Sequence, residues 1–185
     1  MVRNYFQKSN LSLKDKILYL DYTLIFLILL LGIISFFAMY SSERGNFDYY
    51  TKSHLYRFFT FFVIFLVLSF LRIRTWFRIA YIFYFLVLIL LIGVEVFGIT
   101  ASGSKRWINL FIINLQPSEL MKIALIIFLA RYYYKIPTGN VTSIKHLIIP
   151  LFALLIPVYL VIIQPDLGTS VLIAIGGFSV IWLTG

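Results

Sequence analysis

Two short segments of the chain place a carboxylate within two residues after a Gln-Pro pair, a pattern that can begin a helix and present a charge. In the first, Gln116-Pro117-Ser118-Glu119, proline fits the first helical position because its missing N–H is not needed there. Gln116 is then expected at the N-cap and Glu119 in the first turn, near the positive end of the helix. Lys122 shares a helix face with Glu119, so the two should pair. The pair either only neutralises the helix start or turns a polar face toward a cavity.

A second segment, Gln164-Pro165-Asp166-Leu167, repeats the pattern. The helices that follow the two segments are expected to run in the same direction, so Glu119 and Asp166 should lie at a similar depth. Asp166 either caps its helix, which is worth about 0.5–2 kcal/mol, or contributes to a polar site shared with the first segment.

The segment before the first Gln-Pro pair combines small residues, cations and an indole. A run of small residues from Thr100 predicts a flexible turn, and Lys105, Arg106 and Trp107 follow it. The two cations suit the binding of an anionic head group, and the tryptophan ring beside them would face the lipid. The alternative is an interfacial anchor, in which the tryptophan and the cations only mark the membrane boundary.

The composition of the chain excludes a water-soluble enzyme. Of 185 residues, 62% are hydrophobic and 12% are charged, whereas soluble domains average about 45–50% and about 25%. The absence of cysteine excludes disulfides and thiolate metal sites. The net charge of +9 lies between long apolar runs, which is typical of membrane anchoring and not of a nucleic-acid binder.

Apolar runs of this length predict an all-α, polytopic membrane protein, because helices satisfy their own backbone groups in lipid. We expect one integral membrane domain over residues 1–185. Its six predicted transmembrane helices cover about residues 22–40, 56–71, 79–97, 117–134, 147–163 and 167–185.

The distribution of Lys and Arg predicts the orientation of these helices. Ten of these residues fall on the side of the N-terminus and five on the other side, which places the N-terminus in the cytoplasm. The 19 residues from Leu167 to Gly185 carry no charge. A span that reaches the cytoplasm normally meets a Lys or Arg there, so we expect the natural protein to continue beyond Gly185.

Three motifs, in order, resemble those of the SEDS family of RodA, FtsW and SpoVE proteins. They are Gly103-Ser-Lys-Arg-Trp107, Leu115-Gln-Pro-Ser-Glu-Leu-Met-Lys122 and Ile163-Gln-Pro-Asp-Leu-Gly-Thr-Ser170. The resemblance extends over essentially the whole chain and is nearer to the rod-shape (RodA) branch than to the division branch.

This resemblance implies the first six helices of a ten-helix fold in the bacterial inner membrane. It implies a peptidoglycan glycosyltransferase of cell elongation and cell shape, which polymerises lipid II, the undecaprenyl-pyrophosphate-linked disaccharide peptide. It further implies a divalent cation, Mg or Mn, and no organic cofactor. The implied partners are a class B penicillin-binding protein and other membrane proteins of the elongation complex, but no nucleic acid.

The resemblance also assigns roles to residues. Trp107 matches the family's outer-loop tryptophan, Glu119 and Lys122 its helix-four pair, and Asp166 its Gln-Pro-Asp-Leu-Gly aspartate. Glu119 and Asp166 would repel phosphate unless they bind a divalent cation or hold neighbouring cations in place, because hard cations prefer oxygen ligands. The substrate or cation-site candidates are Lys105, Arg106, Trp107, Gln116, Ser118, Glu119, Lys122 and Asp166.

The family's best candidate for the catalytic base lies in a loop after helix seven, beyond this chain. No catalytic residue is therefore expected here, and the chain alone is expected to be inactive. The alternatives are a lipid II flippase or transporter, for which the paired polar helix starts would form the substrate path, and a non-catalytic scaffold of the elongation complex.

Overall fold

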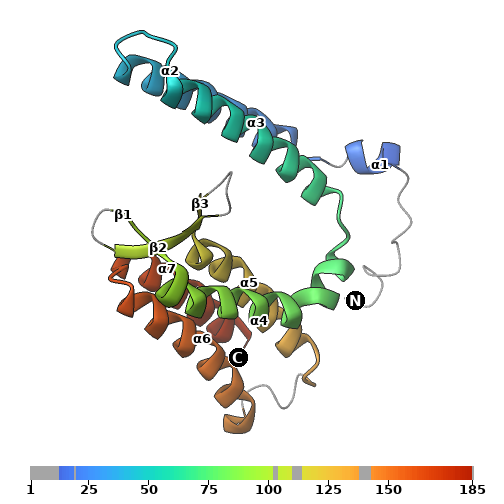
Figure 1. Ribbon diagram of the computed structural model, residues 1–185. Helices are drawn as coiled ribbons and strands as arrows, with labels where there is room; N and C mark the ends of the chain where they lie inside the picture. The colour runs from blue at the N-terminus through green and yellow to red at the C-terminus, as the bar shows by residue number, and fades with distance from the viewer. Residues whose placement is uncertain (1–12, 19, 102–103, 110–113, 138–142, 185) are drawn as a thin grey trace. The chain divides into compact units, whose positions relative to one another are not determined.

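The computed structural model describes residues 13–18, 20–101, 104–109, 114–137 and 143–184 (Figure 1). These residues are mainly helical, in agreement with the predicted fold class. The chain divides into two compact units, Met1–Ile73 and Arg74–Gly185, which we call the hairpin unit and the bundle unit. Each is described separately.

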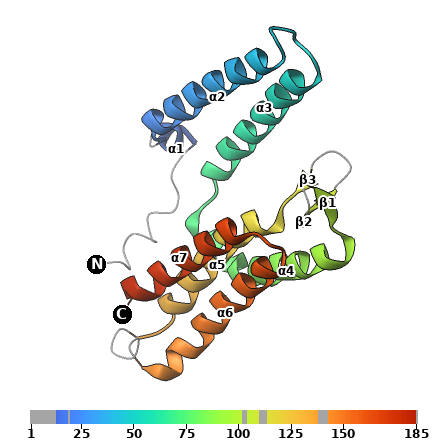
Figure 2. The ribbon, with the colours of Figure 1, turned by 90° about the vertical axis from the view of Figure 1, so that its left-hand side faces the viewer.

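The hairpin unit contains α1 (Leu13–Leu18), α2 (Tyr22–Ser42) and α3 (Tyr49–Ser69), and α2 and α3 run antiparallel side by side (Figures 1 and 2). Asp21 caps α2, because its carboxylate accepts the Leu24 N–H at 3.0 Å. The connection turns at Arg44 and Gly45, whose φ angles of 55° and 80° are left-handed.

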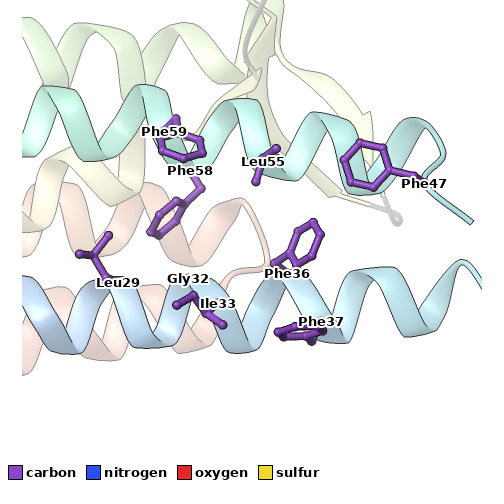
Figure 3. A pocket seen from close by; sticks show the side chains of 9 residues that line it. All are labelled: Leu29, Gly32, Ile33, Phe36, Phe37, Phe47, Leu55, Phe58 and Phe59. Atoms are coloured by element: carbon purple, nitrogen blue, oxygen red, sulfur yellow. The ribbon is translucent and has the colours of Figure 1, made fainter. Parts of the chain in front are cut away.

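Aromatic side chains pack between α2 and α3 around an apolar cavity of about 410 Å³, in which Phe36 and Phe58 come from opposite helices (Figure 3). Gly32 is buried, and a Cβ atom there would overlap the Phe58 ring. Glycine thus allows the ring to approach the α2 backbone. Ser35 Oγ and His54 Nε2, 2.7 Å apart, add a polar contact between the two helices.

The bundle unit contains α4 (Ile73–Phe97, whose first residue marks the boundary), α5 (Pro117–Tyr134), α6 (Ile144–Ile163) and α7 (Leu167–Thr184). Buried residues of α4 recur every three or four positions, at Ala80, Tyr84, Val87, Leu91 and Val94. This spacing forms one helix face, which packs on the core that α5, α6 and α7 complete. Gly177 of α7 lies between α5 and α6 in this core, where a Cβ atom would come within 2.6 Å of Leu154 and 2.8 Å of Leu125.

A proline inside α6 explains a buried hydrogen bond between α4 and α6. Pro157 has no N–H, so it cannot bond the carbonyl of Ala153, four residues earlier. The Tyr84 hydroxyl donates to that carbonyl at 2.8 Å. An unsatisfied carbonyl would be costly in lipid, and the tyrosine supplies the missing donor.

Three short strands follow α4, and the run of small residues from Thr100 that was predicted to be a flexible turn lies where β1 gives way to β2. Strand β2 (Ser104–Asn109) pairs antiparallel with β1 (Ile99–Ala101) and with β3 (Asn114–Leu115). The strands themselves were not predicted; their pairing satisfies the backbone N–H and C=O groups of this segment. Residues 102–103, between β1 and β2, lie outside the described part, so the predicted turn stays a prediction.

Several predicted helix bounds were wrong. Helix α3 begins at Tyr49 instead of 56, α4 at Ile73 instead of 79, and α6 at Ile144 instead of 147. At the other ends, α2 continues to Ser42 instead of 40, and α3 stops at Ser69 instead of 71, while the predicted end of the last helix at 185 lies outside the described residues. Apolar runs locate the part of a helix that crosses hydrocarbon, whereas the helices continue through polar turns.

Five of the described helices, α2, α3, α4, α6 and α7, are long and apolar enough to cross a membrane. Helix α5 has 18 residues and carries Glu119, Lys122 and Arg131. The count of six spans, the cytoplasmic N-terminus and the single domain stay predictions.

Candidate functional site

Asp166 caps the start of α7. Its Oδ1 accepts the Thr169 N–H at 3.3 Å, and its Oδ2 accepts the Thr169 hydroxyl at 2.9 Å. Asp166 is 9% exposed, and Thr169 is equally buried. The capping role that the sequence suggested is therefore present, and the local bonds hold the carboxylate in one orientation.

The two Gln-Pro segments meet at this carboxylate. Gln116 is the N-cap residue of α5, as predicted, and Pro117 is the first helical residue. The Gln116 side chain makes no cap bond, and its Nε2 instead donates to Asp166 Oδ2 at 3.0 Å. The starts of α5 and α7 thus lie side by side, as expected for two helices that run in the same direction.

Arg106 connects strand β2 to Asp166 and to the connection between α6 and α7. Its Nη2 donates to the Pro165 carbonyl at 2.6 Å and its Nε to the Gln164 carbonyl at 3.3 Å. Its Nη1 lies 3.9 Å from Asp166 Oδ1. The guanidinium therefore sits at the negative C-terminal end of α6, where a cation is favoured. All three contacts are with protein groups, so Arg106 holds β2 on the α6–α7 connection.

Gln164, which was not among the candidate residues, is part of this arrangement. It is 4% exposed, and its Nε2 donates to the Leu91 carbonyl of α4 at 3.1 Å. The signal that could have revealed it is the repeat itself, since Gln164 occupies the position that Gln116 has in the first segment. We call Arg106, Gln116, Gln164, Asp166 and Thr169 the Asp166 network.

Glu119 and Lys122 form the predicted pair on α5. Lys122 Nζ lies 2.9 Å from Glu119 Oε2 and donates to Oε1 at 2.9 Å. Their side chains are 54% exposed for Glu119 and 27% for Lys122. Across the described ranges, no hydrogen bond or ion pair connects this pair to the Asp166 network. The two acids of the repeated pattern thus have different surroundings.

The remaining candidates differ in accessibility. Lys105 is exposed on β2, and its side chain has no hydrogen-bond or ion-pair partner within the described residues. Trp107 is half-buried, and Ser118 is only 2% exposed. Strand β2 contacts α5, so Lys105 and Lys122 belong to adjoining elements. A ligand can therefore reach Lys105, Glu119 and Lys122 more readily than Ser118 or Asp166.

A divalent cation does not fit a cage made by these residues alone. In the described part of the chain, no three His, Cys, Asp or Glu side chains form a group that could hold a metal ion. Both oxygens of Asp166 have protein partners, and Glu119 is paired with Lys122. Hard cations need six or more oxygen ligands, and the arrangement does not supply them.

Comparisons with known proteins agree with the motifs. The family model described as cell cycle protein, FtsW/RodA/SpoVE, matches residues 17–185. "Peptidoglycan glycosyltransferase MrdB" of Escherichia coli K12 is 40% identical over 102 residues, which are 55% of this chain and 27% of that protein. "Stage V sporulation protein E" of Bacillus subtilis is 38% identical over 100 residues, 52% of this chain and 26% of that protein.

Solved structures show the same fold. The rod shape determining protein RodA of Thermus thermophilus superposes with a TM-score of 0.79 at 28% identity, covering 91% of this chain and 55% of that one. A chain from a peptidoglycan synthase complex, in a study of how polymerization and crosslinking are coordinated, gives a TM-score of 0.79 at 27% identity. It covers 91% of this chain and 48% of that one. The chain thus spans about half the length of these two solved chains, its matches to MrdB and to the stage V sporulation protein cover about a quarter of theirs, and it belongs to the FtsW/RodA/SpoVE family.

Proposed function

We propose that this chain is the N-terminal half of a RodA-like peptidoglycan glycosyltransferase of cell elongation, which polymerises lipid II. The observation that carries the proposal is the Asp166 network, because it draws on all three motifs of the resemblance. Relatives from the same family are named peptidoglycan glycosyltransferases. The bond-making residues are expected in the other half of the whole protein.

The accessible charges suit a pyrophosphate-linked lipid. Lys105, which is exposed, and Lys122, whose side chain is 27% exposed, lie on the adjoining elements β2 and α5, and within the described ranges neither ammonium group is bonded to a backbone carbonyl, so both can donate to a phosphate. Charge-assisted hydrogen bonds from such groups are stronger than neutral ones. Glu119 holds Lys122 in place, and Arg106 holds the strand that carries Lys105. Arg106 is therefore a positioning residue in this proposal, although the sequence alone suggested a direct role.

A divalent cation remains part of the proposal only through Glu119. Magnesium is usually bound by one or two carboxylates together with substrate phosphates, and the exposed Glu119 could supply one. The cation would neutralise charge on the pyrophosphate. Asp166 is excluded from this role by its four protein contacts.

We further propose a class B penicillin-binding protein as partner and the bacterial inner membrane as location. One structural relative comes from a complex that combines polymerization with crosslinking, which supports a crosslinking partner. Five apolar helices support a multi-pass membrane protein.

The decisive experiment uses the whole protein, purified without any penicillin-binding protein, and labelled lipid II. Incorporation of the label into long glycan strands supports a polymerase. If the protein instead moves lipid II across the membrane of sealed liposomes without making glycan, the flippase alternative is correct. Absence of both activities favours a scaffold.

The predicted orientation can be tested by single cysteines at Lys105 and Ser143, since the chain has no native cysteine. We expect an impermeant thiol reagent to label Lys105→Cys from outside the cell and Ser143→Cys only after the membrane is opened. Labelling of both positions from the same side would contradict the topology.

A further inference from the structure

A second group of cations gathers at the opposite end of the bundle unit from Glu119. Arg74 and Arg78 lie in the first turns of α4, and Arg131 and Lys135 lie at the end of α5. All but Arg131 are exposed, and Arg131 is half-buried. The proposed reaction does not use these residues. We call Arg78, Tyr81, Arg131 and Lys135 the Tyr81 cluster.

The ring of Tyr81 holds two of these cations together. The Arg131 guanidinium lies 4.4 Å from the ring centroid, and Lys135 Nζ lies 5.3 Å from the same centroid. The two charges are therefore no farther apart than the sum of these distances. Arg131 Nη1 also donates to the Arg78 carbonyl at 2.5 Å, which fixes the guanidinium against α4. A fixed guanidinium and an exposed ammonium group over one ring form a site that suits an anion.

Within the bundle unit, no carboxylate of the described residues lies beside this charge. The bundle unit has three acids in its whole sequence, namely Glu95, Glu119 and Asp166. Glu95 lies in the last turns of α4, Glu119 in the first turn of α5, and Asp166 directly before α7. All three acids therefore lie at the end of the bundle unit that is away from the Tyr81 cluster. Cations that converge without a counter-ion repel one another, and an anionic ligand would relieve that repulsion.

Exposed apolar residues continue from the cluster along α4. Ile82 is 70% exposed and Phe85, one turn after Tyr81, is 55% exposed. A surface that is cationic at its end and apolar beside it matches a phospholipid, with the phosphate at the cations and the acyl chains along the helix. A soluble phosphate ion would contact only the cations and would leave the apolar surface beside them uncovered.

We propose that the Tyr81 cluster binds the phosphate of an anionic phospholipid of the surrounding leaflet. The site lies at the other end of α4 and α5 from the proposed substrate site. Its occupancy does not require that the proposed glycosyltransferase function be correct. The lipid would anchor the α4–α5 pair at the membrane surface.

The test titrates the purified full chain, in a zwitterionic detergent, with phosphatidylglycerol and with phosphatidylcholine of the same acyl chains. Native mass spectrometry counts the bound lipid. We expect the wild-type chain to prefer phosphatidylglycerol, and each cation removed to weaken that preference about fivefold. The variants are Lys135→Gln, and Arg131→Gln with Lys135→Gln. Arg131→Lys, which keeps the charge, should retain most of the preference.

Lys52→Gln is the matched control, since Lys52 also lies over a ring, that of Phe47 at 5.8 Å, but in the hairpin unit. It should leave the preference unchanged. Lys135 is exposed and its side chain has no hydrogen bond within the described ranges, so Lys135→Gln should fold and can decide the question alone. An equal preference for both lipids, an unchanged preference in Lys135→Gln, or an equal loss in Lys52→Gln would overturn the proposal. Competition by millimolar inorganic phosphate would do the same, because it would indicate a site for soluble anions.

Discussion

The hairpin unit and the bundle unit each begin a helix with the same chemistry. In the hairpin unit, Glu43 accepts the Thr51 hydroxyl and its N–H, the latter at 3.0 Å. In the bundle unit, Asp166 accepts the hydroxyl and the N–H of Thr169. Both threonines are the third residue of their helix and both are buried.

The two caps differ in what else they hold. Asp48, the local N-cap of α3, makes no side-chain cap bond, and Glu43 from the end of α2 replaces it. Glu43 therefore bonds only within its own hairpin, and it is not buried. Asp166 is buried and also receives Gln116 from α5 and Arg106 from β2. One cap closes a local turn, whereas the other connects three elements of the fold, α5, α7 and β2.

The comparison shows that the value of a polar contact depends on burial and on the number of elements it joins. Removal of a buried acid leaves several donors without an acceptor. The donors that an exposed acid leaves behind can bond to water instead. The predictions below test this ranking through the free energy of unfolding.

Replacement of Asp166 should have the largest effect. Asp166→Ala is expected to lower the free energy of unfolding by about 3 kcal/mol, because Arg106, Gln116 and Thr169 all lose an acceptor. Asp166→Asn keeps an acceptor oxygen and should be milder. Thermal unfolding in detergent, followed by circular dichroism, measures the change. Glu95→Ala is the control, since Glu95 is exposed. Equal stability of Asp166→Ala and the control would refute the ranking.

The Tyr84 hydrogen bond to Ala153 should have the next largest effect. Tyr84→Phe is expected to lower the free energy of unfolding by about 1–2 kcal/mol, since the buried carbonyl loses its donor. In a Pro157→Ala background the helix can supply its own N–H to that carbonyl, and Tyr84→Phe should then cost almost nothing. A double-mutant cycle measures this coupling. Tyr159→Phe, at a tyrosine of α6 that is 65% exposed, is the control. Additive effects of the two substitutions would argue against the explanation.

The Glu119–Lys122 pair should matter less for stability than for activity. Because Glu119 is exposed and Lys122 is only half-buried, removing the pair by Glu119→Gln with Lys122→Met should change the free energy of unfolding by less than about 1 kcal/mol. In the whole protein the same double variant should fold in the membrane and polymerise little or no lipid II. Polymerisation is measured with labelled lipid II, and Glu95→Gln again serves as control. Near-normal polymerisation would reduce the pair to a structural role.

The Glu43 cap should show the smallest effect, and it depends on pH. Hydrogen bonds from Thr51, and from the Tyr50 amide, lower the pKa of Glu43 below its ordinary value of 4.5. Folding thus favours the ionised form. Its contribution is fully present above about pH 4.5 and is lost as the pH falls through the lowered folded-state pKa. Hydrogen exchange at the Thr51 amide, corrected for intrinsic rates, should show this loss of protection. The step should be absent in Glu43→Gln, and a step that persists there would assign it to another group.

The sequence by itself determined the features that depend on near neighbours and on solvent. Its apolar runs predicted a helical membrane protein, because lipid requires segments that satisfy their own backbone groups. Pro117 and Asp166 predicted two helix starts, and the spacing of Glu119 and Lys122 predicted their pair, since helix geometry alone brings such residues together. The ends of the helices and the strands β1 to β3 were less predictable, because polar turns and short strands have no strong periodic signal.

Only the tertiary structure decided which of these residues act together. Arg106 and Asp166, Gln116 and Asp166, and Gln164 and Leu91 are each separated by 50 residues or more. No spacing rule relates such positions, because their contact depends on how α4, α5 and α7 pack and on how β2 lies against them. The sequence therefore suggested Glu119 and Asp166 as parts of one site, and it left open whether they bind a divalent cation or hold neighbouring cations such as Arg106 in place. Packing instead buried Asp166 in a network with Arg106 and left Glu119 at the surface, because a helix face becomes a site only where a neighbouring element covers it.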